Sequence, residues 1–244
     1  FFTQQDIAEF EPYRYKLDDL LKRRDAQVAF DIFKVFRHKM EARTQKIMQL
    51  IEQDFDYTQH DTLNIDRDSF TWAENEKEID QRWEKRIKND TMQQLMAKTP
   101  IDEVRDNLKR RYQRQRDVIF QLKADEVFEW YMNSFTRDHG PHTTYMSHVT
   151  AENFEIGMSL QLTGIGAALT TDEDYTVINR ILKGGPAEKS GAIEAEDKII
   201  AVGQEDGEMI NVIGWRLNDV VQMIRGDKGT KVRLDILPSD MAPG

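Results

Sequence analysis

Apolar residues recur at helical spacing through residues 1–138 of the chain. Ile79, Trp83 and Ile87 lie at i, i+4 and i+8, which places them on one face of a helix. Residues 54–72 are rich in Asp, Asn, Thr and Ser and predict a long loop. We therefore predict an all-α N-terminal domain whose apolar stripes form its core. The stripe before the loop consists of Ala29, Phe33, Phe36, Met40, Ile47 and Ile51.

Two helix starts are predicted in the second half of this domain. Thr99 followed by Pro100 predicts a hydroxyl N-cap with proline at the first helical position. Asp102 and Glu103 then lie in the first turn, where acidic side chains are favoured. A last helix is expected to begin after Asp125. The predicted buried faces are Val104, Leu108, Tyr112 and Ile119, and Val127, Phe128, Tyr131 and Phe135.

The pattern changes to strand-like alternation after Phe154. Met158–Leu169 is an apolar, strand-like run in which Leu160 and Leu162 alternate with polar residues. The further predicted strands are Tyr175–Leu182, Asp197–Gly203 and Gly229–Ile236.

Two helices are predicted among these strands. A short helix begins at Pro186, where Pro-Ala follows two glycines. The second, Trp215–Arg225, carries Leu217, Val221 and Ile224 at i, i+4 and i+7.

The fold class predicted from these patterns is α+β. Residues 1–150 form a helical domain with a connecting segment, and residues 155–238 form a small β-barrel or sandwich with two helices. Residues 239–244 form a short tail.

Composition and charge argue against two classes of function, nucleic-acid binding and membrane spanning. A net charge of −10 argues against general nucleic-acid binding, which depends on neutralising phosphates. Lys109-Arg110-Arg111, with Arg114 and Arg116, is surrounded by acids and is best explained as a solvated helix face. No apolar run approaches the length needed to span a bilayer. We therefore expect neither nucleic acid nor a membrane span.

Metal and cofactor chemistry has little support. The chain has no Cys, which excludes disulfides and thiolate metal sites. His139, His142 and His148 are spaced three and six apart, a weak ligand pattern that favours surface or hydrogen-bonded histidines. The chain starts at Phe1 without Met or a signal-like segment, as if taken from within a protein or already processed.

The tripeptide Gly164-Ile165-Gly166 is the strongest candidate for a binding site. Glycine on each side of Ile165 lets the backbone approach another chain closely. A strand edge beside a helix is what a peptide-binding groove requires. The pattern therefore favours a binding module over a catalytic centre.

Several segments carry a resemblance to a known family. Gly164–Ala167 resembles the carboxylate-binding loop of PDZ domains, and Gly185–Gly203 resembles their middle signature. Gly226–Leu234 is similar to the final segment in bacterial PDZ proteases. Pro141–Ser147 resembles the segment that precedes the PDZ domain in C-terminal processing peptidases, although Gly140 stands where that family usually has Asp.

The long charged helical region, with Tyr175–Asn179 and Val212–Leu217, resembles the tail-specific proteases of Gram-negative bacteria within that peptidase family. The resemblance implies a periplasmic serine endopeptidase with a Ser nucleophile and a Lys general base. Both lie in a protease core that follows the PDZ domain, so we expect residues 1–244 to hold no catalytic residues and no activity of their own. The family also implies a helical-repeat lipoprotein adaptor as a partner.

The resemblance implies peptide-binding residues as well. The amides of Ile165, Gly166 and Ala167 would hold the carboxylate of a protein's C-terminal tail, with Gly164 and Gly166 kept free of side chains. A pocket for an apolar last residue (Ala, Val or Leu) would be lined by Ile165, Leu217, Val221 and Ile224. The competing explanation is that these apolar side chains only fill the core. An alternative function is a stand-alone PDZ scaffold that binds a partner's C-terminus.

Overall fold

The computed structural model describes residues 1–59, 61–64, 66, 69–159 and 164–240. Contacts divide the chain into two units, Phe1–Ser147 and His148–Gly244. Each unit has its own hydrophobic core. The division lies three residues before the end of the predicted helical domain at residue 150.

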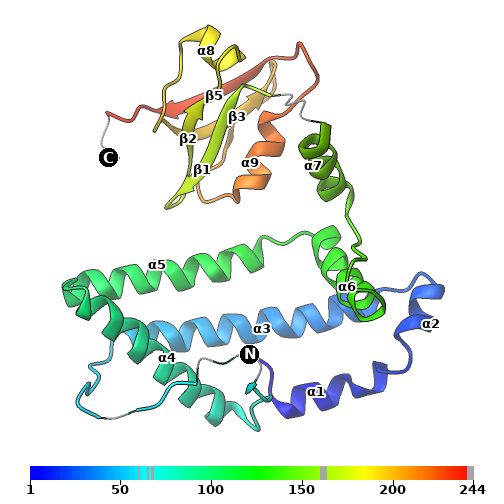
Figure 1. The fold of residues 1–244 in the computed structure, drawn as a ribbon, viewed down its shortest axis with the longest axis vertical. Coiled ribbons are helices and arrows are strands. Elements are labelled where there is room, and N and C mark those ends of the chain that lie inside the picture. Colours follow the sequence, from blue (N-terminus) through cyan, green and yellow to red (C-terminus); the bar gives the residue numbers. More distant parts are fainter. Residues whose placement is uncertain (60, 65, 67–68, 160–163, 241–244) are drawn as a thin grey trace. The chain divides into compact units, whose positions relative to one another are not determined.

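The first unit is helical (Figure 1). Its longest helix packs against the three that follow the loop, and the loop predicted at residues 54–72 contains no long element among its described residues. The elements are α1 (Gln4–Phe10), the 3-10 turn η1 (Glu11–Tyr13), α2 (Leu17–Lys22), α3 (Gln27–Ile51), α4 (Glu76–Met96), α5 (Ile101–Phe120) and α6 (Ala124–His139).

The predicted apolar stripes form the core of this unit. Ile87, Val104 and Leu108 are 0% exposed, and Tyr112 packs with them from α5. Trp83 packs against this cluster from its edge. The buried part of the earlier stripe on α3 is Ala29, Met40, Ile47 and Ile51.

The start of α5 differs from the prediction at Thr99. The structure places Pro100 at the N-cap in an extended conformation, and the helix begins at Ile101. Thr99 instead belongs to the C-terminal end of α4. Its amide donates a hydrogen bond to the Gln94 carbonyl, and Lys98 before it adopts a left-handed φ of 65°. This pairing is typical of a helix C-terminus, so Thr99 closes one helix instead of starting the next.

The start of α6 also differs slightly. The helix begins at Ala124, two residues before the position expected after Asp125. The amide of Lys123 donates to the Glu126 carboxylate at 2.9 Å, which satisfies one of the free donors at a helix start.

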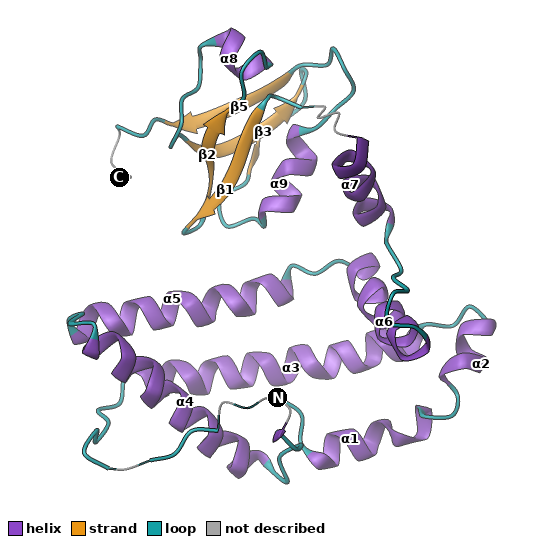
Figure 2. Ribbon diagram, viewed as in Figure 1, coloured by secondary structure: helices purple, strands orange, loops and turns teal. Residues whose placement is uncertain are grey.

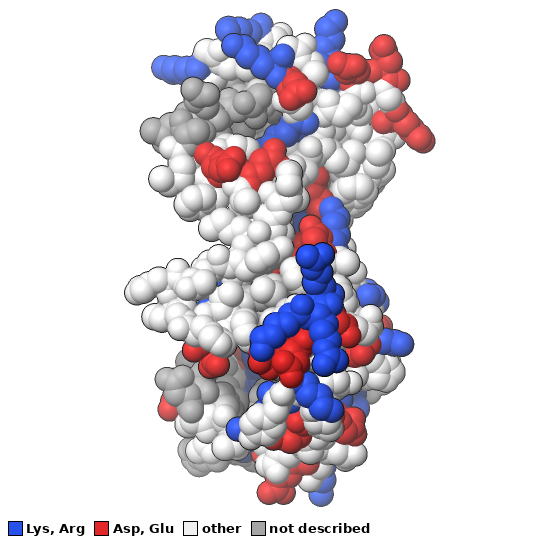
Figure 3. Space-filling model, turned by 90° about the vertical axis from the view of Figure 1, so that its right-hand side faces the viewer, with Lys and Arg blue, Asp and Glu red and all other residues white. Residues whose placement is uncertain are grey.

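Three of the five basic residues in the run on α5 pair with acids. Lys109 pairs with Glu52, and Arg116 lies 2.7 Å from a Glu41 oxygen. Arg111 pairs with a carboxylate of α4. Figure 3 shows Lys and Arg side chains beside Asp and Glu side chains on the face drawn. The run therefore belongs to a mixed-charge helix surface.

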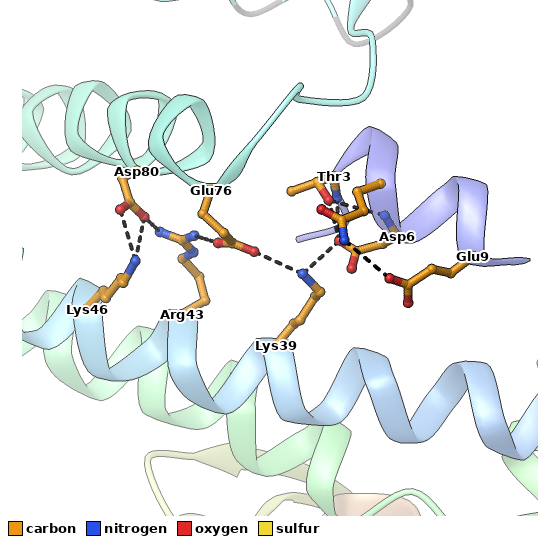
Figure 4. Close-up of polar contacts among 9 residues, drawn as sticks. Thr3, Asp6, Glu9, Lys39, Arg43, Lys46, Glu76 and Asp80 are labelled. Atoms are coloured by element: carbon orange, nitrogen blue, oxygen red, sulfur yellow. Dashed lines mark hydrogen bonds and ion pairs between the residues drawn. The ribbon is translucent and has the colours of Figure 1, made fainter.

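A buried arginine joins α3 to α4 (Figure 4). Arg43 is 4% exposed and donates from Nη2 to Glu76 at 2.9 Å and from Nη1 to Asp80. Lys39 extends the network, with Nζ 2.9 Å from Glu76 and 2.7 Å from Asp6 of α1. Three helices are thus joined by alternating charges.

The pKa of Asp80 reflects this network. Partial burial acts to raise it, but hydrogen bonds from Lys46 and Arg43 outweigh burial and hold the pKa below its ordinary value. The ionised form of Asp80 is therefore the one that the folded state favours.

Replacing Arg43 with Ala should lower the free energy of unfolding by about 1–2 kcal/mol, less than the 3–5 kcal/mol typical of fully buried pairs. Glu76 and Asp80 are 52% and 43% exposed and can be hydrated once the guanidinium is gone. Urea unfolding followed by far-UV circular dichroism measures the change. The control is Lys22→Ala, which breaks an exposed pair with Asp18 and should leave the free energy of unfolding nearly unchanged. Equal effects of the two variants would contradict this role of Arg43.

The second unit combines a sheet with helices (Figure 2). The elements are α7 (His148–Ser159), β1 (Ala167–Asp172), β2 (Tyr175–Ile181), α8 (Pro186–Ser190), β3 (Lys198–Gln204), β4 (Ile210–Asn211), α9 (Leu217–Ile224) and β5 (Val232–Leu237). The predicted strand-like run from Met158 to Leu169 is partly wrong, because Met158 lies in α7 and the strand begins at Ala167. Leu160 and Leu162 lie outside the described residues.

The sheet is antiparallel, and β1 is at its edge. The strands run in the order β1-β2-β3-β4, with β5 also paired to β3. Strands β1 and β2 form a hairpin closed by Glu173 and Asp174, with Asp172 opposite Tyr175. A register shift leaves Asn179 of β2 unopposed, so β1 itself is continuous.

One face of the sheet carries the core of this unit. Ile178, Ile199 and Val202 of the sheet pack with Val220 and Ile224 of α9. Helix α9 lies beside β1 and β3 (Figure 2). It begins at Leu217, two residues later than predicted. The delay follows the turn at residues 212–215, where Gly214 has a φ of 76°.

Candidate functional site

The loop before β1 is fixed through its carbonyl groups. The Ile165 carbonyl accepts a hydrogen bond from the Ala187 amide at 2.8 Å, and the Gly166 carbonyl accepts one from the Leu182 amide at 2.8 Å. Within the described ranges, no backbone acceptor pairs with the amides of Ile165 and Gly166. The carbonyls thus hold the loop against β2 and α8, and two successive amides remain as donors.

A close backbone contact requires glycine at position 166. Gly166 has a φ of +77°, and a Cβ there would lie 2.8 Å from the Gly185 Cα and 3.2 Å from the Pro186 Cδ. A Cβ on Gly185 would in turn lie 3.0 Å from the Gly166 Cα. A Cβ on Gly164 meets nothing within 4 Å. Of the two glycines in the tripeptide, only Gly166 is required by contacts within the described chain.

The outer edge of β1 is open to pairing at Ala167. Ala167 lies opposite Ile181, and the Leu182–Gly166 hydrogen bond follows directly. That arrangement marks Ala167 as a non-hydrogen-bonded position of the antiparallel pair, so its own N–H and C=O point away from β2. Because β1 is an edge strand, these groups can pair with another extended chain.

Helix α9 supplies apolar side chains beside this edge. Leu217 and Val221 are half-buried, and α9 packs against β1. Ile224, predicted to line a pocket, is 5% exposed and belongs to the core cluster. Ile165 is half-buried and packs against the same cluster. We call the loop Gly164–Ala167, the outer edge of β1, and the Leu217 and Val221 side chains the recognition edge.

The C-terminal end of α9 is held by Gln204. The Gln204 side-chain amide donates to the Met223 carbonyl at 2.5 Å and to the Arg225 carbonyl at 3.0 Å. These are carbonyls that a helix end leaves without partners. Sequence reasoning missed Gln204, because nothing in the local pattern links the end of β3 to a helix that starts thirteen residues later.

Metal binding finds no support in the histidines. The Nδ1 atom of His139 lies 3.0 Å from the Phe135 carbonyl within α6. Over the ranges that the structure describes, no group of three or more His, Asp or Glu residues is placed to hold a metal ion. In the same ranges, no helix combines the length and the apolar character needed to cross a membrane.

The class of the second unit follows from these features. A five-stranded antiparallel sheet, a glycine loop before an edge strand and a helix beside that edge define a PDZ domain. Family comparison agrees, because residues 148–237 match the PDZ domain. Residues 1–149 match the tail-specific protease N-terminal domain. The chain therefore belongs to the tail-specific protease family.

Relatives of the chain are named as tail-specific or carboxy-terminal processing proteases. The chain is 37% identical over 239 residues to the tail-specific protease of Haemophilus influenzae, covering 98% of this chain and 34% of that protein. It is 38% identical over 96 residues to the carboxy-terminal processing protease CtpA of Bacillus subtilis, covering 39% of this chain and 19% of the relative. The chain thus spans about a third of the Haemophilus protein.

A solved structure is also similar in sequence. It is the PDZ domain of a carboxy-terminal protease from Vibrio cholerae in complex with peptide. The match has 52% identity, covers 32% of this chain and 79% of that one, and has a TM-score of 0.31.

Replacing Gly166 with Ala should loosen the loop. The new Cβ would collide with the Gly185 backbone at a left-handed φ, so the hydrogen bond from the Leu182 amide should weaken. We expect the Leu182 amide to exchange with solvent at least tenfold faster, as measured by NMR-detected hydrogen exchange.

The matched control is Gly184→Ala. Gly184 has a similar φ of +79°, but a Cβ there meets nothing within 4 Å. The control therefore carries the same backbone strain, about 1–3 kcal/mol, without the collision. Equal acceleration of Leu182 exchange in both variants would show that strain alone acts.

Proposed function

We propose that the second unit binds the C-terminal tails of protein substrates at the recognition edge. The tail would add to β1 as an antiparallel strand, a recognised mode of peptide binding. The observation that carries this proposal is the loop whose carbonyls are bonded inward while the amides of Ile165 and Gly166 have no backbone acceptor among the residues that the structure describes.

The terminal carboxylate is the ligand group that suits these donors. Successive backbone amides form a concave anion site, and a hydrogen bond to a charged acceptor is stronger than one between neutral groups. The Ala167 amide, which points away from β2, would continue the pairing along the edge. Carboxylate capture at the start of β1 also sets the direction of the peptide.

The last side chain of the tail would lie against α9. Leu217 and Val221 are half-buried there, and Ile165 packs on the core beneath. These apolar groups favour a tail that ends in Ala, Val or Leu. Ile224 is 5% exposed, so it would contribute only from beneath the side chains that contact the last residue of the tail.

We propose further that tail binding serves a periplasmic serine endopeptidase that cleaves the proteins it captures. The names of the relatives and the match of residues 1–149 support this role over a stand-alone scaffold. The helical unit would act as a platform that can receive a helical-repeat lipoprotein adaptor. A chain extended by the remaining length of its Haemophilus relative should degrade a protein that carries an apolar tail. The same protein with its tail masked should remain intact.

The test of tail binding compares peptides that differ only at the C-terminus. A peptide ending in a free Leu or Val carboxylate should bind, and the same peptide with an amidated end should bind roughly 10- to 100-fold more weakly. That ratio corresponds to about 1.5–3 kcal/mol for hydrogen bonds to a charged group. Isothermal titration calorimetry on residues 1–244 measures both affinities.

A second pair of peptides checks the apolar preference. Replacing the last residue with Asp should weaken binding at least tenfold, because a second carboxylate would be desolvated against Leu217 and Val221. Equal affinity of the free and amidated peptides would refute carboxylate capture. Equal affinity of the Leu- and Asp-ended peptides would refute the apolar pocket but would leave carboxylate capture standing.

A further inference from the structure

A groove of about 500 Å³ lies between the first half of α3 and the end of α5 in the helical unit. Its apolar lining is aromatic, with Phe30 and Phe33 from α3 and Phe120 from α5, and all three side chains are half-buried. Trp130 of α6, which is 48% exposed, extends this surface, with its ring edge-on to Phe33 at 6.4 Å between centroids. The aromatic rings can therefore cover an apolar side chain of a ligand.

Two guanidinium groups share the ring of Phe120. The Arg37 Cζ lies 4.5 Å from the ring centroid, and the Arg116 Cζ lies 4.3 Å from the same centroid. Arg116 is also bonded to acids, since its Nε lies 2.7 Å from Glu41 and its Nη1 lies 2.7 Å from Asp117. The charge of Arg116 is thus offset by neighbouring carboxylates.

The other cations of the groove lack such partners. Among the residues that the structure describes, Arg37 and Lys34 form no ion pair, and Glu41 is the one acid in the lining. Lys34 and His38 are exposed along the same side of α3. The groove therefore has an excess of positive charge on a chain whose net charge is −10. This contrast points to an anionic ligand.

The spacing of the lining residues sets the size of that ligand. Phe30, Lys34, Arg37 and Glu41 lie at i, i+4, i+7 and i+11, so they share one face of α3. At about 1.5 Å per residue, this stretch is about 16 Å long. A short peptide segment matches that length. An arginine stacked on a ring keeps the N–H groups at its edge free to bind a carboxylate.

We propose that the groove between α3 and α5 binds an internal acidic segment of a partner protein. Glu or Asp side chains of the segment pair with Arg37 and Lys34, and a Phe or Leu side chain covers Phe30 and Phe33. A nucleic-acid backbone or an anionic membrane needs cations spread over a wider area than two unpaired side chains provide. The inference is independent of tail binding, because an internal segment has no terminal carboxylate.

The experiment uses an acidic peptide of about twelve residues, acetylated and amidated, with Phe and Leu four positions apart and Glu around them. The amidated end removes the group that the recognition edge is proposed to hold. Isothermal titration calorimetry on residues 1–244 should show binding, and the indole N–H signal of Trp130 should shift in ¹H–¹⁵N NMR spectra. Replacing Glu with Lys in the peptide should abolish binding. Replacing its Phe and Leu with Ala should weaken binding at least about tenfold.

Charge reversals on the protein locate the site. Arg37→Glu and Lys34→Glu should each weaken binding of the acidic peptide at least about tenfold, because each removes a cation and adds a repelling acid. Lys34 is exposed, so its variant should keep the circular dichroism spectrum of the parent chain even if Arg37→Glu disturbs the packing on Phe120.

The matched control is Arg114→Glu. Arg114 is an exposed cation on α5 that does not line the groove, and the substitution changes the net charge by the same amount. This variant should bind the acidic peptide within about twofold of the parent chain. Equal weakening in Arg114→Glu and Lys34→Glu would show a general effect of charge and overturn the assignment.

Two further outcomes would also overturn the proposal by naming another occupant. One is binding of phosphatidylglycerol vesicles that Lys34→Glu abolishes, when the acidic peptide does not bind. The other is a dimer in sedimentation that Lys34→Glu dissociates, which would make the groove an interface between copies of the chain. If the amidated acidic peptide fails to bind while free-carboxylate tails bind, the groove proposal is wrong and tail binding stands. The reverse result would reject tail binding and keep the groove.

Discussion

The backbone contact between Gly166 and Gly185 is the constraint on which the recognition edge depends. It brings the loop before β1 within van der Waals distance of the start of α8, at a φ that side chains rarely adopt. From this position, the Ile165 and Gly166 carbonyls reach donors on α8 and at the end of β2. Because the carbonyls bond inward, the amides are the polar groups left at the edge.

The rest of the second unit supports that geometry. The core shared by Ile178, Ile199 and Val220 fixes α9 against the sheet, so the helix lies beside β1. Gln204 holds the end of α9, and Gly214 joins its beginning to the hairpin turn. A free strand edge, an apolar helix face and a glycine loop are thus positioned by one small core. The helical unit has a separate core and is held by alternating charges around its buried arginine.

Much of the fold could be predicted because apolar spacing is a local signal. The stripes of the long helices and the strands β2, β3 and β5 lie within a few residues of where the spacing places them, whereas the glycine tripeptide precedes β1 instead of lying within a strand. Errors arose where contacts that apolar spacing does not reveal decide the structure. Thr99 has the chemistry of an N-cap, but its amide bonds to the Gln94 carbonyl five residues earlier and so closes α4. Ile224 shares a helical face with Leu217 and Val221, and only packing against the sheet shows that it is buried while they remain half-exposed. The partner of Gln204 lies across the domain, which no local pattern reveals.

The most direct measurement follows individual amides by ¹H–¹⁵N NMR while a peptide with a free apolar C-terminus is added. Carboxylate capture predicts that the Ile165 and Gly166 amide protons move downfield more than any others, with Ala167 and the remaining residues of β1 also shifted. The amidated peptide should leave the Ile165 and Gly166 signals near their starting positions. Shifts that concentrate on β4 or β5, or that are the same for both peptides, would contradict a carboxylate held at this loop.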